Sequence, residues 1–220
     1  QFTQKTSHGQ VWEIRKCNAC GHGFVANRPS LEKLKEIYSG DTHHSCETPE
    51  SLDLESRVDC RTLAADITKL SPERGRSLDI GCGNGGFSYH LAKQGYKPTL
   101  IDLDPRAQRA ATAIPGAEFH LVALEDFADK GPFSAIIMSQ VLEHALDPLD
   151  WLKRSQRVLS PKGVLAVAVP NCGGVYSFLG ARDPFLIPPV HLNFFTPRSL
   201  NLAFEKAGLR PLWTTSRSEL

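Results

Sequence analysis

A surplus of either charge is missing from this sequence. Its 25 lysine and arginine residues are balanced by 24 aspartate and glutamate residues, which leaves a formal net charge of +1 over 220 residues. Proteins that bind DNA or RNA carry a basic patch or stripe, so this balance argues against a nucleic-acid partner. Long apolar runs are missing as well: none reaches transmembrane length, and the first residues contain no signal-peptide core. We therefore expect no membrane partner.

Cysteine is too scattered for a disulfide framework. Two of the six cysteines, Cys82 and Cys172, lie in apparent loops of a nucleotide-binding fold. Such usage is typical of a reduced, cytoplasmic protein. Internal repeats are absent too, and nothing in the pattern bears on the oligomeric state. The chain neither begins with Met nor continues far past its last predicted strand, so we expect a piece of a longer protein, truncated at the C-terminus.

Short apolar segments alternate with amphipathic ones between residues 78 and 172. The apolar segments are the predicted strands Ser77–Gly81, Thr99–Asp102, Glu118–Val122, Ser134–Met138 and Val164–Val169. Helices are predicted between them, at about Gly86–Gln94, from Asp104 as N-cap to Pro115, and at about Pro148–Leu159. Apolar strands separated by helices indicate an α/β fold, Rossmann-like, with a doubly wound and mostly parallel sheet.

Further segments flank this core. A lead-in helix is expected over residues 54–70, and another begins after Thr196 as N-cap and ends at Gly208. A last strand is expected from about Leu209 to Thr215. Residues 1–50 differ in character and form a small N-terminal appendage, with a short helix predicted at Leu31–Tyr38. We therefore divide the chain into this appendage and a domain over residues 51–220.

A glycine-rich turn follows the first predicted strand and fits two templates. Gly81, Gly83 and Gly86 make the dinucleotide pattern G-x-G-x-x-G, whereas Asp79, Gly81, Gly83 and Gly85 make D-x-G-x-G-x-G. Glycine lets the backbone approach a ligand closely and aims the N–H groups of a helix start at it. Both templates predict a nucleotide-like cofactor, but they differ in the chemistry that it brings.

Asp79 favours the second template. A dinucleotide fold usually keeps apolar residues up to its first glycine, whereas Asp79 lies inside this strand. An ionised carboxylate is costly to bury unless a ligand group pairs with it. S-adenosylmethionine, with its amino group and sulfonium centre, offers such a partner. The alternative is a water-bridged carboxylate that only holds the turn in place.

The chain from about residue 55 to 215 resembles the class I S-adenosylmethionine-dependent methyltransferases. The resemblance rests on the segment 78–87, the segment 99–105, the run 133–144 with its Leu-Glu-His ending and the following Asp147-Pro148, and the turn 159–165. It implies the fold of that class and S-adenosylmethionine as cofactor. The implied cofactor-binding residues are Asp79, Gly81, Cys82, Gly83 and Gly85 around the methionine part, Asp102 on the ribose hydroxyls, Leu103, Leu124 and Glu125 at the adenine, and Ser139 and Gln140 near the sulfonium.

Two histidines are candidates for a catalytic base. Methyl transfer needs mainly alignment, but a hydroxyl acceptor also needs its proton removed. His144 follows the fourth predicted strand, and His191 lies in a Pro-rich loop that precedes Asn193. The alternative is that His144 caps a helix start and that His191 holds the loop by hydrogen bonds.

The balanced charge and the Met138–Val141 ending of the fourth strand favour a small-molecule acceptor over a nucleic acid. The resemblance points to the branch that acts on quinones, sugars and other metabolites, with oxygen as the expected acceptor atom and nitrogen and carbon left open. Two other functions remain as alternatives: an NAD-dependent oxidoreductase, and a methyltransferase-like binding module without catalysis.

Cys17-x-x-Cys20 followed by Gly21 resembles half of a zinc ribbon. A structural zinc ion needs four ligands, and the second Cys pair is missing. Further ligands would have to come from His8, His22, His43, His44 or Cys46. The prediction is thus zinc at Cys17 and Cys20, with a metal-free remnant as the alternative.

Overall fold

The computed structural model describes residues 2–7, 9–30, 32–34, 53–71, 73–128, 130–174 and 186–216. The described chain forms two compact units. One, the parallel-sheet unit, consists of the described residues of 42–141 and 154–168. The other, the antiparallel-sheet unit, consists of those of 1–41, 142–153 and 169–220. Along the described chain, no helix is both long enough and apolar enough to cross a membrane.

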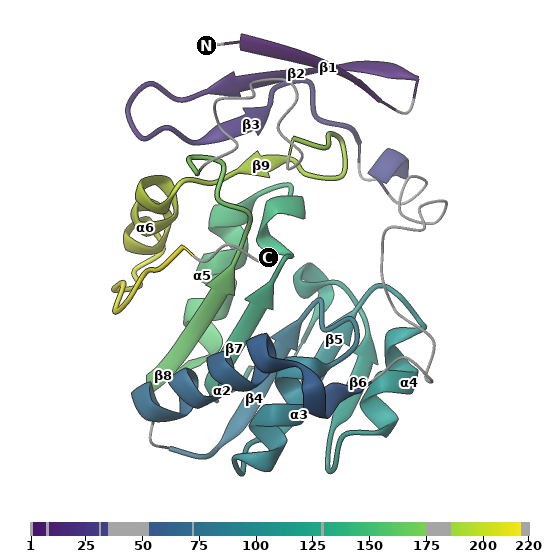
Figure 1. Cartoon of the computed structure of the whole chain (residues 1–220), viewed down its shortest axis with the longest axis vertical. Coiled ribbons are helices and arrows are strands. Elements are labelled where there is room, and N and C mark those ends of the chain that lie inside the picture. Colours follow the sequence, from purple (N-terminus) through teal and green to yellow (C-terminus); the bar gives the residue numbers. More distant parts are fainter. Residues whose placement is uncertain are drawn as a thin grey trace. The chain divides into compact units, whose positions relative to one another are not determined.

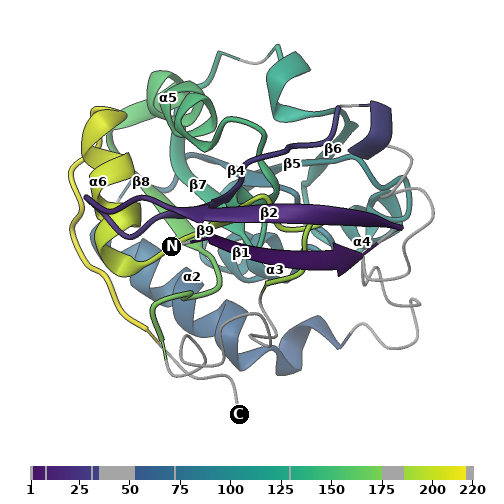
Figure 2. The ribbon, with the colours of Figure 1, turned by 90° about the horizontal axis from the view of Figure 1, so that it is seen from above.

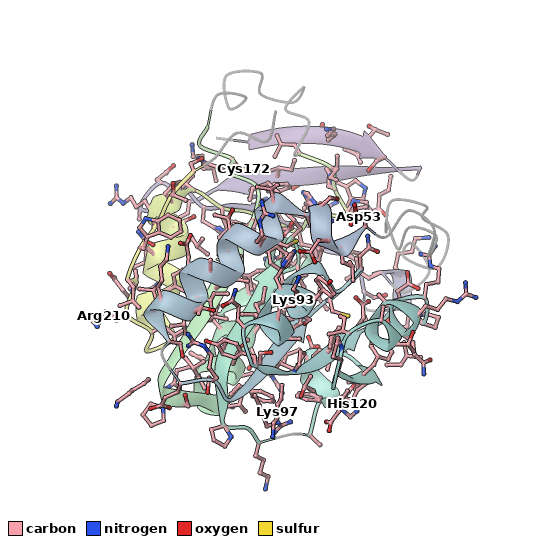
Figure 3. All side chains as sticks on the ribbon, turned by 60° about the horizontal axis from the view of Figure 1, so that its bottom comes forward. Asp53, Lys93, Lys97, His120, Cys172 and Arg210 are labelled. Carbon is pink, nitrogen blue, oxygen red and sulfur yellow. The ribbon has the colours of Figure 1, made fainter. Side chains whose placement is uncertain are left out.

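The parallel-sheet unit is built on five strands in the order β6-β5-β4-β7-β8, all pairs parallel (Figure 1). The strands are β4 (Arg76–Ile80), β5 (Lys97–Asp102), β6 (Glu118–Leu121), β7 (Phe133–Ser139) and β8 (Leu159–Ala168). Lys97 begins β5 and His120 lies on the edge strand β6 (Figure 3). The prediction of a Rossmann-like, doubly wound parallel sheet is confirmed.

Helices cover this sheet because the strand β7 buries side chains on both of its faces. All five apolar residues of β7 from Phe133 to Met138 are buried, which leaves neither face of the strand to water. The helices and short helical turns are η2 (Leu54–Ser56), α2 (Val58–Leu70), α3 (Gly86–Lys93), α4 (Ala107–Thr112), η3 (Leu124–Asp126) and α5 (Pro148–Val158). In Figures 1 and 2, α2 and α3 lie together on one face of the sheet.

The antiparallel-sheet unit holds four strands in the order β1-β2-β3-β9. These are β1 (Phe2–Ser7), β2 (Gln10–Lys16), β3 (Gly23–Val25) and β9 (Asn193–Phe194), and α6 (Pro197–Lys206) follows. Figure 2 shows β1 and β2 as neighbouring arrows. Trp12 and Ile14 alternate on the buried face of β2 and pack in one cluster with Val25 and Phe194. The N-terminal strands thus share a sheet with residues late in the chain, a pairing that the sequence analysis does not predict.

Two local predictions are wrong. Residues 209–216 form no strand, and Leu212 and Trp213 lie exposed there, because a lone segment without a partner strand gains no ladder of hydrogen bonds. Helix α4 begins at Ala107 rather than after Asp104, whose carboxylate accepts hydrogen bonds from Arg106 and so stabilises a turn before the helix. Of the predicted helix at Leu31–Tyr38, residues 32–34 are helical and the remainder lies outside the described residues.

Candidate active site

The glycine-rich turn after β4 requires its glycines for two different reasons. Gly81, Gly83 and Gly85 have φ angles of 65°, 47° and 67°, a region that residues with a Cβ rarely adopt. A Cβ atom on Gly81 would lie 2.6 Å from Val141 Cγ2, and one on Gly85 would lie 2.7 Å from Ile114 Cδ1. A Cβ on Gly83 would meet no described atom within 4 Å. Gly81 and Gly85 are therefore constrained by packing, whereas Gly83 faces open space.

Three strand ends meet beside this turn. Ile80 of β4 pairs with Ile101 of β5 and with Met138 of β7, so these strands end at the same level of the sheet. Ligands in open α/β sheets bind outside the carboxyl ends of the strands, where the strand order reverses. The turn, Asp102 and Ser139 all lie at such an edge.

Asp79 and Asp102 are the two carboxylates of this edge. Asp79 is only 2% exposed, and its Oδ2 accepts a hydrogen bond of 2.8 Å from Ser88 Oγ. Burial, more than the nearby charge of Asp102, raises the pKa of Asp79 to about 6. Asp102 is half-buried and accepts hydrogen bonds of 2.8 Å from the N–H groups of Gly83 and Asp104. Asp102 therefore holds the turn in place, while the hydrogen bonds to Asp79 come from the neutral hydroxyl and backbone N–H of Ser88.

The remaining predicted cofactor residues differ in exposure. Leu103 is 63% exposed directly after β5, an unusual position for a leucine. Leu124 is buried in η3, whereas Glu125 is exposed there and its carbonyl accepts a hydrogen bond from Arg154. The side chain of Cys82 packs in a core cluster with Leu54, Leu100 and others, and its carbonyl accepts a hydrogen bond of 2.8 Å from Gly85 N–H.

Gln140 has the one positive φ angle, 55°, of any non-glycine residue in the described ranges. It follows Ser139 at the end of β7, and its N–H donates to the carbonyl of Ala168 at the end of β8. A left-handed conformation costs a residue with a Cβ of the order of 1 kcal/mol and is concentrated at functional sites. This backbone strain makes the end of β7 a candidate part of a functional site.

A second group of candidate site residues lies in the antiparallel-sheet unit. His144 ends the short helical turn η4 (Leu142–His144), and its Nδ1 lies 2.7 Å from the carbonyl oxygen of Val190. Because a carbonyl only accepts, Nδ1 must carry the proton, which leaves the lone pair on Nε2. The rings of His144 and His191 lie edge to face, with centroids 5.0 Å apart. The two histidines predicted from the sequence are thus brought together.

Glu143 and Asn193 belong to the same group, although the sequence analysis assigns them no role. Glu143 is 1% exposed, and burial raises the pKa of its carboxyl to about 8. Its main chain is tied to the loop of His191, since Leu192 N–H donates to Glu143 O at 2.9 Å. Asn193 Nδ2 donates to Ala145 O at 2.7 Å. Sequence reasoning could have found both residues, because Glu143 lies within the Leu-Glu-His motif and Asn193 within the His-x-Asn motif.

Cys17 and Cys20 lie on a tight turn after β2. Cys17 N–H donates to His22 O and Gly21 N–H donates to Cys17 O, at 2.8 and 2.9 Å. Hydrogen bonds from the backbone N–H groups of Cys20 and Ala19 lower the pKa of Cys17. Within the described ranges neither cysteine belongs to a group of three or more metal-ligating side chains, and His8, His43, His44 and Cys46 lie outside those ranges. Zinc at this turn stays a prediction.

A family model described as a methyltransferase domain matches residues 54–213. The match covers well over half of the 220 residues, including the glycine-rich turn and both histidines. The chain belongs to this methyltransferase family. The membership predicted from the sequence motifs is therefore confirmed.

Two relatives of this methyltransferase chain carry the same name. A ubiquinone biosynthesis O-methyltransferase of Xylella fastidiosa is 37% identical over 159 residues, covering 65% of this chain and 64% of the relative. One from Xanthomonas axonopodis pv. citri is 31% identical over 156 residues, covering 64% of this chain and 65% of the relative. The chain thus spans just under two thirds of the length of these relatives.

A solved structure has the same fold as this methyltransferase chain. It is Burkholderia thailandensis 1,6-didemethyltoxoflavin-N1-methyltransferase with bound 1,6-didemethyltoxoflavin and S-adenosylhomocysteine. The TM-score is 0.65, with 96% of this chain and 90% of that chain covered at 15% identity. This likeness concerns the fold alone, and it agrees with the predicted class I methyltransferase architecture.

Proposed function

We propose that this chain is an S-adenosylmethionine-dependent methyltransferase that transfers a methyl group to an oxygen of a small molecule. The observation that carries the proposal is the edge at β4, β5 and β7, where a buried carboxylate, Asp79, lies below a turn with open space at Gly83. A cationic ligand group beside Asp79 would compensate the cost of an ionised carboxylate in that position. The methyltransferase domain would comprise residues 51–220, in keeping with the family match over 54–213.

The other end of the cofactor would lie along β5. The carboxylate oxygens of Asp102 already accept hydrogen bonds from Gly83 and Asp104, and their remaining lone pairs would bind the ribose hydroxyls. The exposed Leu103 would pack on the adenine. An acid at this strand end commonly binds ribose in nucleotide-binding α/β folds. The remaining cofactor contacts in the proposal are Gly81, Cys82 (through its backbone), Gly85, Leu124, Glu125, Ser139 and Gln140.

The reaction is an in-line displacement. A lone pair on the acceptor oxygen would form the new C–O bond as the methyl–sulfur bond breaks, and the sulfur would keep the bonding pair. The acceptor proton would pass to Nε2 of His144, whose Nδ1–H is directed to Val190 O. Such a base contributes about 10²–10⁴-fold. His191 is the second candidate for this role, since its ring lies against that of His144.

The sequence relatives support oxygen as the acceptor atom. Both are named as ubiquinone biosynthesis O-methyltransferases and are more than 30% identical to this chain. The near-zero net charge supports a quinone, sugar or other metabolite rather than a nucleic acid. We also propose that the chain works in the reducing environment of the cytoplasm. Cys17 and Cys20 would supply two of the ligands of a zinc ion.

Thermal melts with two ligands test the cofactor. S-adenosylhomocysteine at 100 times its Kd should stabilise the chain by about 2.7 kcal/mol, and NAD should leave the melting temperature unchanged. Stabilisation by NAD alone would establish an oxidoreductase and overturn the proposal.

Turnover with a panel of phenols, quinols and sugars tests the catalytic role. His144→Asn should retain S-adenosylhomocysteine binding and lose about 10²–10⁴-fold in kcat. His120→Asn, on the exposed edge strand β6, is the matched control and should keep full turnover. Cofactor binding without turnover on any acceptor would instead favour a catalytically inactive binding module.

A further inference from the structure

Ser88 is a fully buried residue of α3 to which the proposed function gives no role. Its exposed fraction is 0%, and its Oγ donates a hydrogen bond of 2.8 Å to Asp79 Oδ2. The backbone N–H of Ser88 donates to the Asp79 carboxylate as well. One residue of α3 thus supplies two donors to a carboxylate near the end of β4. Since Ser88 has no exposed surface, its effect on a ligand would pass through Asp79.

The start of α3 explains why a carboxylate from the sheet is held there. Gly85 occupies the N-cap position with a φ of 67°, and without a side chain it cannot accept a hydrogen bond from the first turn of the helix. The first N–H groups of a helix need acceptors from elsewhere. Asp79 supplies such an acceptor to Ser88, the third residue of α3. The helix therefore orients this carboxylate beside the glycine-rich turn.

The surroundings of Asp79 otherwise oppose its negative charge. Burial disfavours the ionised form, and the charge of Asp102 on β5 adds to this effect. On α2 the nearby thiol of Cys60 is neutral, because burial raises its pKa to about 12. In the register with β7, Asp79 is paired with the apolar Ile137. The two donors of Ser88 act in the opposite direction and favour the carboxylate.

We propose that Ser88 is a positioning residue for the cofactor, whose hydroxyl keeps Asp79 charged and oriented toward the cationic amino group of S-adenosylmethionine. A hydrogen bond to an ionised acceptor is stronger than one to its neutral form, so the donor favours the carboxylate over the carboxylic acid. The role of Ser88 rests on the proposed function, because the ligand is the cofactor named there. The serine itself would not touch the cofactor.

The affinity for S-adenosylhomocysteine, measured by calorimetry between pH 6 and pH 8.5, tests this role. Ser88→Ala removes the donor, so the pKa of Asp79 should rise by about one unit. From that rise, Kd should be about fivefold larger than in the wild type at pH 6 and should match it at pH 8.5, where both carboxyls are charged. Titration of the ligand itself affects both proteins equally.

Two further variants make the comparison specific. Ser88→Thr keeps the hydroxyl and should keep the wild-type profile. Ser77→Ala is the matched control, because it removes a buried hydroxyl from the same strand as Asp79. The Oγ of Ser77 has no hydrogen-bond partner among the described residues, so its loss should leave the profile unchanged. Should Ser88→Ala fail to fold by circular dichroism, Ser88→Cys takes its place, since a thiol is a weak donor of similar size.

A Kd that is larger by the same factor at every pH in Ser88→Ala would overturn the role, because a merely structural loss does not depend on the charge of Asp79. An equal upward shift in Ser77→Ala would do the same.

A measurement without cofactor separates this role from the proposed function. The loss of unfolding free energy caused by Ser88→Ala should grow from pH 5 to pH 8, and this growth should be absent in an Asp79→Asn background. A loss that is constant with pH would refute the role of Ser88. If the wild type failed to bind S-adenosylhomocysteine while the loss still grew with pH, the proposed function would be wrong and the effect of Ser88 on the charge of Asp79 would stand.

Discussion

Asp79 illustrates at the scale of one residue how function opposes stability. Its carboxyl is held away from water and accepts hydrogen bonds from the hydroxyl and the backbone N–H of Ser88. The ionised form is therefore disfavoured, and the pKa rises from 3.8 to about 6. At neutral pH the folded chain still carries this charge, at a cost of about 3 kcal/mol relative to water. A cationic ligand would recover part of that cost.

Asp79→Asn should therefore separate stability from binding. At pH 7 we expect the free energy of unfolding in urea to rise, by up to about 3 kcal/mol, because a neutral amide replaces a buried charge. The stabilisation by S-adenosylhomocysteine should be lost in the same variant. Asp66→Asn, which removes a half-buried carboxylate paired with Lys69 at 3.5 Å, is the control and should change both quantities little. A variant that melts lower and still binds the ligand would contradict this account.

The pH dependence follows from the same carboxyl. Its pKa is raised on folding, so the folded state binds the proton more tightly than the unfolded chain does. The resulting stabilisation is fully present below pH 3.8 and is lost as the pH rises through about 6. The stability difference between Asp79→Asn and wild type should shrink as the pH falls from 7 to 5, measured by urea unfolding. S-adenosylhomocysteine affinity should fall over the same interval, and a flat profile of both quantities would refute the assignment.

At the scale of an element, the turn after β4 combines glycines of two kinds. Gly81 and Gly85 have no room for a Cβ, whereas Gly83 has free space and a φ of 47°. Gly116 offers a matched comparison, because it has a φ of 71° and equally open surroundings outside the turn. The two open glycines differ mainly in whether a ligand is expected beside them.

Gly83→Ala and Gly116→Ala should each lower the free energy of unfolding by about 1–2 kcal/mol, the cost of a Cβ in a left-handed conformation. Only Gly83→Ala should weaken S-adenosylhomocysteine binding, as measured by calorimetry. Equal affinities in the two variants would show that the space at Gly83 is not occupied by the ligand.

Helix α6 begins with a complete capping box. Thr196 Oγ1 accepts from Ser199 N–H at 3.2 Å, and Ser199 Oγ accepts from Thr196 N–H at 2.9 Å. Thr196→Ala should cost about 1 kcal/mol of unfolding free energy, whereas Thr196→Ser keeps the accepting oxygen and should cost less than half as much. Urea denaturation midpoints of the two variants provide the measurement, and equal losses would mean that the methyl group, rather than the cap, is responsible.

Local sequence predicted the elements whose signals are complete within a few residues. Thr196 with Pro197 places the start of α6 correctly, since capping bonds involve neighbours only. The five parallel strands were found because they are short segments, most of them rich in apolar residues, that alternate with predicted helices. Strands β1, β2, β3 and β9 were missed. Of these, β9 has only two residues and gains its pairing from β3, about 170 positions earlier. The positive φ of Gln140 and the burial of Glu143 could not be predicted, because backbone strain and burial arise only on packing.

On the scale of the whole molecule, the chain passes between the two units several times, once inside a continuous helix. One crossing falls between Lys153 and Arg154 within α5, and another follows β7 between Val141 and Leu142. All three tryptophans, Trp12, Trp151 and Trp213, belong to the antiparallel-sheet unit, whereas the glycine-rich turn belongs to the other. Fluorescence therefore reports on the unit that does not hold the turn.

We expect the two units to unfold in one transition, because a helix shared by both cannot remain intact when one is lost. S-adenosylhomocysteine should raise the melting midpoint of tryptophan fluorescence and that of far-ultraviolet circular dichroism by the same amount. Gly83→Ala should abolish both shifts. A ligand-dependent shift in circular dichroism with an unchanged fluorescence midpoint would show that the units melt independently.

The sequence by itself determined the parallel sheet, the glycine-rich turn with Asp79 and Asp102, and membership of the methyltransferase family. Each of these depends on residues that are close in the chain, where periodicity and turn chemistry operate. The tertiary structure alone decided that β9 completes the N-terminal sheet, that Gln140 is held at positive φ, and that Glu143 lies unpartnered beside His144 and His191. Those features arise from burial and from contacts between distant residues, and neither is encoded in any local pattern.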